Sequence, residues 1–212
     1  MSLALQADHD LSRANTLGLP CRAEHFAAPT TTAELKEALA LARRAAWPLT
    51  VLGGGSNLIL PARLGGLVLR PAMKAWWLEA GEGDVVRVHA EAAVVWHDLV
   101  MALAARGLWG TENLALIPGH CGAAPIQNIG AYGVELGEVL EAVHLVHLED
   151  GREAVLSAGD CALGYRDSIF KGGLDGRVVI TRLVMRLSRS PHPRLGYGDL
   201  APGWAPRPAP WR

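Results

Sequence analysis

Two glycine-rich segments and one short segment around an arginine are the parts of this sequence best suited to chemistry. The first is Gly53-Gly54-Gly55-Ser56-Asn57, which follows an apolar stretch at 49–52. Its backbone N–H groups can cradle a diphosphate without a lysine. It is not a Walker loop, because no Gly-Lys-Ser/Thr follows, and Leu58 stands where a dinucleotide fingerprint needs its third glycine. The alternative interpretation is a glycine-rich turn without a ligand.

The second segment, residues 117–133, mixes glycine, proline, amides and a tyrosine with almost no charge. A surface loop of this length normally carries charge, whereas an uncharged loop suits close packing against a flat aromatic ligand. Gln127 and Asn128 have amide groups that could bond the carbonyl and imide groups of such a ring. Two glycine-rich loops far apart in sequence therefore predict one extended ligand with phosphates and a ring, as a dinucleotide has.

The third segment is Gly164-Tyr165-Arg166-Asp167-Ser168. Arginine presents a planar fork of donors, so Arg166 is a natural partner for a carboxylate or for developing enolate charge. The alternative is a surface ion pair between Arg166 and Asp167, which is common and carries no function.

Other candidate sites are weaker. His144 and His147 stand three apart on a predicted strand and so face opposite ways, and we expect no metal site. Ser56 has no base beside it in the sequence, which argues against a nucleophile. Trp76 and Trp77 could form a binding surface, but in so apolar a chain we expect them in the core.

Hydrophobic periodicity predicts helices over 31–46 and 94–106, with Thr31 and Glu34 in capping-box spacing and Gly107 after the second helix. Short apolar runs predict strands, the first of them buried, at 49–52, 58–60, 67–69, 85–90, 142–148, 153–156 and 178–187. Asp150-Gly151 predicts a hairpin turn. Strands in runs with few helices indicate the α+β class. The proline-rich tail, 201–212, is predicted to be disordered.

Composition narrows the function further. The chain has 212 residues, half of them hydrophobic and 19% charged, and a net charge of -1. No basic stripe suggests nucleic acid as a partner, so we expect a small-molecule ligand. Three separated cysteines favour reduced thiols. The start lacks the features of a signal peptide, and no apolar run is long enough for a membrane span, so we expect a cytoplasmic protein; its oligomeric state stays open.

Five motifs in order resemble the UDP-N-acetylenolpyruvoylglucosamine reductase family. They are Asn15-Thr16-Leu17-Gly18, the 53–57 loop, 117–133, 164–171 and Tyr197-Gly198-Asp199-Leu200. The resemblance implies an FAD-binding fold of the vanillyl-alcohol-oxidase type, with subdomains at 1–70 and 71–200. It also implies that FAD takes a hydride from NADPH and passes it to the enolpyruvyl group of a nucleotide sugar. That reaction serves peptidoglycan synthesis, and with it cell-wall biogenesis, cell shape and cell division.

The resemblance also implies roles for individual residues. Arg166 corresponds to the catalytic arginine, with Tyr165 beside it, and Tyr197 resembles a tyrosine that closes over the substrate, to which Arg166 also binds. Loop 53–57 would hold the flavin diphosphate, and 117–133 would line the flavin. The cofactor-binding residues expected on this basis are Gly53, Gly54, Gly55, Ser56, Asn57, Leu58, Pro118, Gly119, Gly122, Ala123, Gln127, Asn128, Gly130, Ala131, Tyr132 and Gly133.

The chain departs from the family pattern in two ways. His120-Cys121 replaces a small residue and a valine, so the histidine is expected either to crowd the flavin or to replace a hydroxyl donor. The family's further substrate domain, with its proton-donor serine and late glutamate, is not found after Leu200, which suggests a truncated or frameshifted gene. Losing a positioned acid costs about 10²–10⁴-fold in rate.

Three hypotheses follow. The chain is a working reductase, or it is a flavin-binding module without catalysis, or it is another flavoprotein of the same fold, such as an oxidase. The reductase-like segments 117–133 and 164–168 disfavour the oxidase. The missing proton donor predicts little or no reductase turnover.

Overall fold

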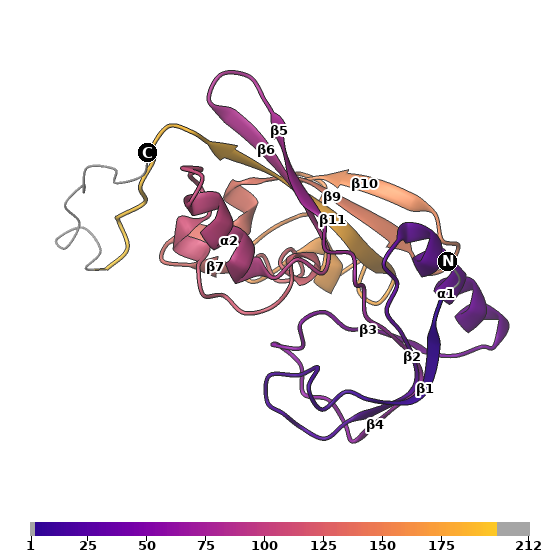
Figure 1. The fold of residues 1–212 in the computed structure, drawn as a ribbon. Coiled ribbons are helices and arrows are strands. Elements are labelled where there is room, and N and C mark those ends of the chain that lie inside the picture. The colour runs from indigo at the N-terminus through magenta and orange to yellow at the C-terminus, as the bar shows by residue number, and fades with distance from the viewer. Residues whose placement is uncertain (1–2, 199–212) are drawn as a thin grey trace.

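The computed structural model describes residues 3–198, so the predicted disordered tail at 201–212 lies outside the described residues. Two sheets dominate the structure, and Figure 1 shows them on opposite sides of the molecule. Residues before position 70 form the smaller sheet, and residues after it form the larger one. Strands therefore come in runs, and the predicted α+β class is confirmed.

The smaller sheet has four strands in the order β1-β2-β4-β3. The β1–β2 pair is antiparallel, whereas β4 runs parallel to both β2 and β3. The strands are β1 (Leu5–Asp10), β2 (Arg22–Ala27), β3 (Leu49–Val51) and β4 (Arg63–Leu69).

The larger sheet has five antiparallel strands in the order β10-β9-β11-β6-β5. Its strands are β5 (Trp76–Ala80), β6 (Val85–Glu91), β9 (Leu140–His147), β10 (Glu153–Ser157) and β11 (Val178–Ser188). The predicted turn joins β9 to β10, where Gly151 adopts a φ of +75°. A small hairpin of β7 (Gly130–Ala131) and β8 (Val134–Glu135) lies in the second glycine-rich segment.

Both predicted helices are present, and both are shorter than predicted. Helix α1 (Thr32–Arg44) buries the predicted apolar face of Leu35, Ala38, Leu39 and Ala42. Thr31 Oγ1 accepts the Glu34 amide as the capping box requires, but Glu34 reaches back to the amide of Thr30, one residue further than predicted. Helix α2 (Trp96–Ala104) begins only after Val95 has bridged to His120. Single 3₁₀ turns follow at Glu112–Leu114, Cys121–Ala123, Leu136–Glu138 and Ile169–Lys171.

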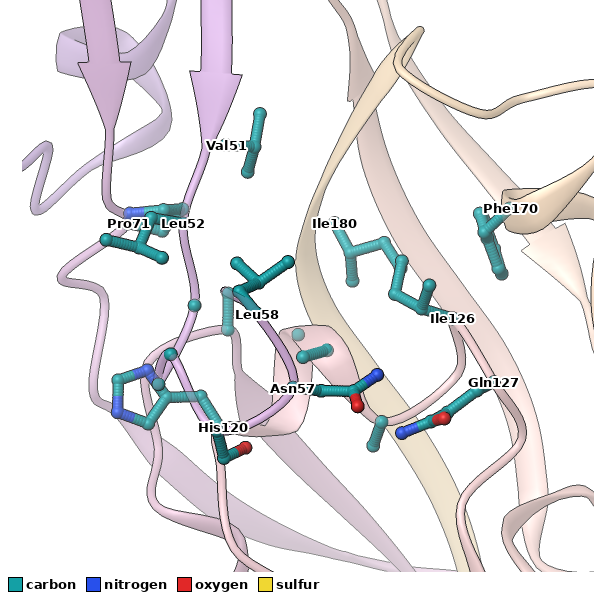
Figure 2. A pocket seen from close by; sticks show the side chains of 18 of the residues that line it. Val51, Leu52, Asn57, Leu58, Pro71, His120, Ile126, Gln127, Phe170 and Ile180 are labelled. Carbon is teal, nitrogen blue, oxygen red and sulfur yellow. The ribbon is translucent and has the colours of Figure 1, made fainter. Parts of the chain in front are cut away.

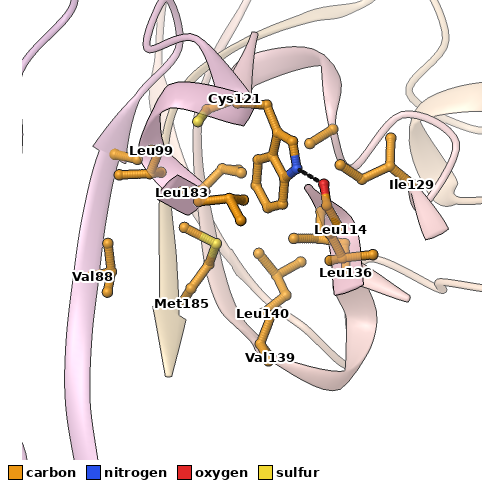
Figure 3. Packing of buried hydrophobic residues seen from close by; sticks show 14 of the residues in the cluster. Val88, Leu99, Leu114, Cys121, Ile129, Leu136, Val139, Leu140, Leu183 and Met185 are labelled. Carbon is orange, nitrogen blue, oxygen red and sulfur yellow. Dashed lines mark hydrogen bonds between the residues drawn. The ribbon is translucent and has the colours of Figure 1, made fainter. Parts of the chain in front are cut away.

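The largest core lies between α2 and one face of the five-stranded sheet. Figure 3 shows Leu114, Leu136, Leu183 and Met185 gathered there. The dashed line in that figure marks the bond from the buried Trp96 Nε1 to the Leu114 carbonyl oxygen, 2.9 Å long. Burying an indole is favourable only when its N–H finds an acceptor, so this bond fixes α2 against the 3₁₀ turn.

A second core joins the two sheets. The apolar face of α1 packs with Leu67 and Leu69 of β4 and with Val146 and Val179 from the larger sheet. Arg43 of α1 adds bonds of 3.1 Å to the carbonyl oxygens of Leu148 and Glu149 beyond β9. Shared apolar burial of this kind holds the two sheets as one body.

Three local predictions were wrong. Residues 58–60 form no strand; Ile59 is 82% exposed on a loop. The strand at 49–52 is not fully buried, because Val51 is 37% exposed. Trp77 does not enter the core: it is 39% exposed on the edge strand β5, where it stacks on His89 with ring centroids 4.8 Å apart. No helix within residues 3–198 has the length and apolarity to span a bilayer.

Candidate cofactor site between two glycine-rich loops

The first glycine loop is held in place by the N-terminal turn. Gly55 has a φ of +73°, and a Cβ there would overlap the Ala14 carbonyl oxygen. Its own carbonyl oxygen accepts the Thr16 amide at 3.2 Å. The neighbouring Asn15 is buried and bonds both to the carbonyl oxygen and to the amide of Leu19. The motif at 15–18 therefore supports the loop, and glycine is required at position 55 because nothing larger fits.

The two glycine-rich loops meet backbone to backbone. A Cβ on Gly54 would lie 2.9 Å from Gly119 Cα, closer than real Cβ atoms come. The Ser56 hydroxyl donates to the Pro118 carbonyl oxygen at 3.3 Å. Gly122 approaches the larger sheet in the same way, since its Cβ would lie 2.8 Å from Ala92 Cβ. The glycines remove side-chain bulk where three segments converge.

A cavity of about 510 Å³ lies beside this junction, a volume typical of small-molecule sites. Figure 2 shows Val51, Leu52 and Leu58 on one side and Ile126, Phe170 and Ile180 on the other. The figure also shows the Asn57 and Gln127 side chains reaching toward each other. Ten of the predicted cofactor residues line the cavity: Gly53, Gly54, Gly55, Ser56, Asn57, Leu58, Pro118, Gly122, Ala123 and Gln127.

The other predicted residues lie outside this lining. Asn128 is buried, and its amide group bonds to the Gly164 carbonyl oxygen and the Gly137 amide, at 3.0 and 2.9 Å. It ties the second loop to the arginine segment, and both ends of its amide are engaged within the protein. The remaining predicted residues without a place in the cavity wall are Gly119, Gly130, Ala131, Tyr132, Gly133, Tyr165, Arg166 and Tyr197.

Tyr165 and Arg166 form the tip of a tight turn. The Gly164 and Asp167 backbones exchange two hydrogen bonds, of 3.0 and 3.1 Å. Arg166 has a φ of +54°, an uncommon conformation for a residue with a side chain, and such strain often occurs at functional sites. Its Nη2 donates to the Gly130 carbonyl oxygen at 2.8 Å. Within the described chain Arg166 and Asp167 form no salt bridge, so the alternative of a surface ion pair is wrong.

Two tyrosines lie near this turn. Tyr132 and Gly133 both have positive φ, as the two-residue turn of the β7–β8 hairpin requires. The Tyr132 ring packs edge-on against Tyr197, with centroids 5.9 Å apart. Asn113 bonds to the Tyr132 carbonyl oxygen at 3.0 Å. Arg166 is linked to the same hairpin through Gly130, so the structure brings the predicted substrate-binding residues to one side of the second loop.

The family model described as "FAD binding domain" matches residues 23–157, which include both glycine-rich loops. The chain belongs to this family of FAD-binding domains. Its cofactor is FAD, as predicted.

Relatives of this FAD-binding domain confirm the resemblance. It is 44% identical over 201 residues to a UDP-N-acetylenolpyruvoylglucosamine reductase of Chromobacterium violaceum, and 45% identical over 200 residues to that of Pseudomonas aeruginosa. Each alignment covers 94% of this chain and 59% of the relative. The chain thus spans less than two thirds of the length of these relatives.

Solved structures agree on the fold. The reductase from Thermus caldophilus matches with a TM-score of 0.68 and 29% identity, over 90% of this chain and 64% of that one. A vanillyl-alcohol-oxidase-type flavoprotein from Myceliophthora thermophila matches with a TM-score of 0.57 at 16% identity, over 79% of this chain and 32% of that one. The predicted fold type is therefore confirmed.

The lining of the cavity suits FAD. The glycines at 53–55 and 122 line the cavity without side chains, so backbone forms part of its wall. A backbone surface stripped of side chains is what close approach to a diphosphate requires. The apolar wall of Val51, Phe170 and Ile180 suits a flat ring.

The far wall of the cavity was not predicted. It consists of Phe170, Leu174, Asp175, Gly176, Val178 and Ile180, which come from the end of the arginine segment and the start of β11. The run at 171–176, with three glycines, was the available signal, but no periodicity links it to the other loops. Tertiary folding alone brings it to them.

His120 is the ionisable side chain at the loop junction. It lines the cavity and is half-buried, and Figure 2 shows its ring below Pro71, beside the segment that follows Leu52. Burial lowers the pKa of His120, and the charges of Arg70 and Lys74 lower it further. The adjacent Cys121 is fully buried, and burial raises the pKa of its thiol to about 12. Cys121 therefore serves as a small apolar core residue.

Proposed function

We propose that this FAD-binding domain is the flavin-holding part of a UDP-N-acetylenolpyruvoylglucosamine reductase that uses NADPH. The similarity over 94% of the chain to reductases so named carries the proposal, and the cavity between the two glycine-rich loops supports it. Bound FAD would relay a hydride from NADPH to the enolpyruvyl double bond. We place the protein in the cytoplasm, where its nucleotide-sugar substrate would serve peptidoglycan synthesis.

The residues divide into three roles in this proposal. Loop 53–57, with Pro118, Gly122 and Ala123, holds the diphosphate, and Gln127 bonds the edge of the ring. Arg166 steadies negative charge on the substrate carboxylate, because its guanidinium is exposed and no carboxylate of residues 3–198 pairs with it. Tyr165, Tyr132 and Tyr197 offer ring surface beside it.

A division into two subdomains at residue 70 belongs to the same proposal. The two separate sheets support it, one built before that residue and one after it. In this proposal the hairpin that carries Tyr132 is formed by Gly130, Ala131 and Gly133. The two glycine-rich loops are held in position by Asn128 and Gly119.

A second candidate is FAD binding without reduction of the substrate. One observation favours it: Tyr165 is 84% exposed and Arg166 is also exposed, so these groups are open to water. Electrostatic stabilisation of developing charge is strongest where water is excluded.

Two measurements test the proposal. The visible absorbance of the purified protein, before and after added FAD, reports flavin binding; colourless protein that rejects FAD would overturn both candidates. NADPH oxidation that depends on the enolpyruvyl nucleotide sugar separates them. Turnover that is lost in Arg166→Gln but kept in Arg152→Gln supports the reductase, whereas flavin binding without turnover supports the second candidate. Arg152 is a suitable control because it lies in the β9–β10 turn, paired with Asp150.

A further inference from the structure

Three basic side chains lie near one another beside the junction of the glycine-rich loops. His120 lines the cavity, and Arg70 and Lys74 are close enough for their charges to act on it. Arg70 is fixed against the first loop, since its Nε donates to the Gly53 carbonyl oxygen at 3.2 Å. Within residues 3–198 neither Arg70 nor Lys74 takes part in a salt bridge, so this positive charge is not neutralised by the protein.

The His120 ring is free to bind a ligand. Its ring nitrogens make no hydrogen bond to any described part of the chain, and neither nitrogen is among the buried atoms left without a partner. They are therefore accessible to a ligand. The ring lies against the first loop, because a Cβ on Gly54 would be 3.4 Å from His120 Cδ2.

Other ionisable groups do not face this ring from the elements around it. Loop 53–58 contains none, and on the 117–124 segment Cys121 is turned into the core. At the start of α2, His97 is directed to Leu116, whose amide it accepts at 3.1 Å. Arg70 and Lys74, between β4 and β5, are the charges that act on His120.

We propose that His120 binds the FAD diphosphate and that its imidazole becomes protonated when it does so. Cofactor binding therefore takes up a proton and weakens as pH rises. The inference rests on the proposed function, because it requires FAD in this cavity. In the free protein, burial and the two cationic neighbours lower the pKa of the ring and so disfavour its charged form. A diphosphate at the loop junction reverses that balance, because its negative charge favours the imidazolium and offsets the charges of Arg70 and Lys74.

The sign of the effect follows from linkage. FAD binding raises the pKa of His120 from its lowered value in the free protein. Between the two pKa values, binding takes up a proton, and affinity falls by up to about tenfold per pH unit as pH rises. Below this window the ring is charged in both states, and above it the ring is neutral in both, so affinity is level at either side.

The test is calorimetric titration of FAD into the FAD-free full chain, over a series of pH values and in two buffers with different ionisation enthalpies. For the wild type we expect net proton uptake and affinity that falls with pH. For His120→Gln we expect binding without uptake and a flat pH profile. His192→Gln is the control, since this histidine is exposed and lies outside the cavity lining.

The outcomes separate the two proposals. FAD binding without proton uptake in the wild type overturns the role of His120 and leaves the cofactor site intact. An unchanged pH profile in His120→Gln does the same. A protein that binds no FAD at any pH overturns both. The wild-type measurement needs no variant, so a folding defect in His120→Gln cannot mask the result.

Discussion

Gly55 and Gly18 share a left-handed backbone, with φ of +73° and +63°, but differ in their surroundings. A Cβ at Gly18 meets nothing within 4 Å, whereas one at Gly55 meets the Ala14 carbonyl. We expect Gly18→Ala to cost about 1 kcal/mol, from backbone strain alone. Gly55→Ala should cost roughly 1–3 kcal/mol more, because the N-terminal turn must move. Chemical denaturation measures both; equal costs would mean that the turn does not press on the loop.

The cysteines provide a second prediction for single residues. All three are buried, and burial raises the pKa of Cys121 to about 12 and that of Cys161 to about 11. Because the thiolate is the reactive form, native protein should not react with a thiol reagent at mildly alkaline pH. After denaturation all three should react. Rapid labelling of the native protein would show that the cores around these residues open.

At this scale the sequence indicated many of the residues that line the cavity. Glycines and amides at 53–57 and 117–127 could be identified because a short motif carries its own geometry. Asn128 was harder to interpret, since an amide that reads a ligand and one that ties two loops look alike in sequence. His120 could be noticed only as a departure from a pattern, and its neighbours Arg70 and Lys74 became visible only through the fold.

At the scale of elements, the N-terminus of α1 depends on one hydroxyl. Thr31 Oγ1 accepts the Glu34 amide at 3.1 Å. Thr31→Ala should therefore lower the free energy of unfolding by about 1 kcal/mol. Thr32→Ala, one residue into the helix, is the control and should change it by less than about 0.5 kcal/mol. If both variants behave alike in urea denaturation, the cap does not hold this helix.

The arginine turn gives a prediction that separates backbone from side chain. Arg166→Ala loses the bond to Gly130 and keeps the left-handed strain, whereas Arg166→Gly loses the bond and removes the strain. We expect the glycine variant to be more stable than the alanine variant by about 1 kcal/mol. Thermal melts of the two proteins check this. An alanine variant that is at least as stable would mean that this turn is not left-handed in solution.

Periodic elements were predictable, and irregular ones were not. The apolar face of α1 was predicted correctly because helical spacing is a local property. The run at 58–60 was predicted as a strand from its composition, yet it finds no partner strand and follows the loop. Val51 illustrates the same limit, since an apolar side chain that faces a cavity has the same sequence signal as one in a core.

For the whole molecule, the cavity has walls from both sheets, so a ligand there should stabilise their association. At about 100 times its dissociation constant, FAD should add about 2.7 kcal/mol, which corresponds to a melting-temperature rise of roughly 5–10 °C. FMN lacks the adenosine half and should raise the melting temperature less. Equal shifts with FMN and FAD would show that the adenosine half makes no stabilising contact with the domain.

The α+β class and the FAD-binding fold type were accessible from the sequence, the first through the pattern of strands and the second through family resemblance. The position of the 171–176 run across the cavity from the first loop was not, because segments more than a hundred residues apart leave no local trace of their proximity.

The contact between Gly54 and Gly119 also bears on protein engineering. The floor of the cavity belongs to neither loop alone, because each is shaped by the backbone of the other. Transplanting residues 53–57 into another scaffold would carry the glycines and leave behind the surface that orders them. Any successful graft must move both segments together, with Ala92 and Ala14 as the surfaces on which they rest.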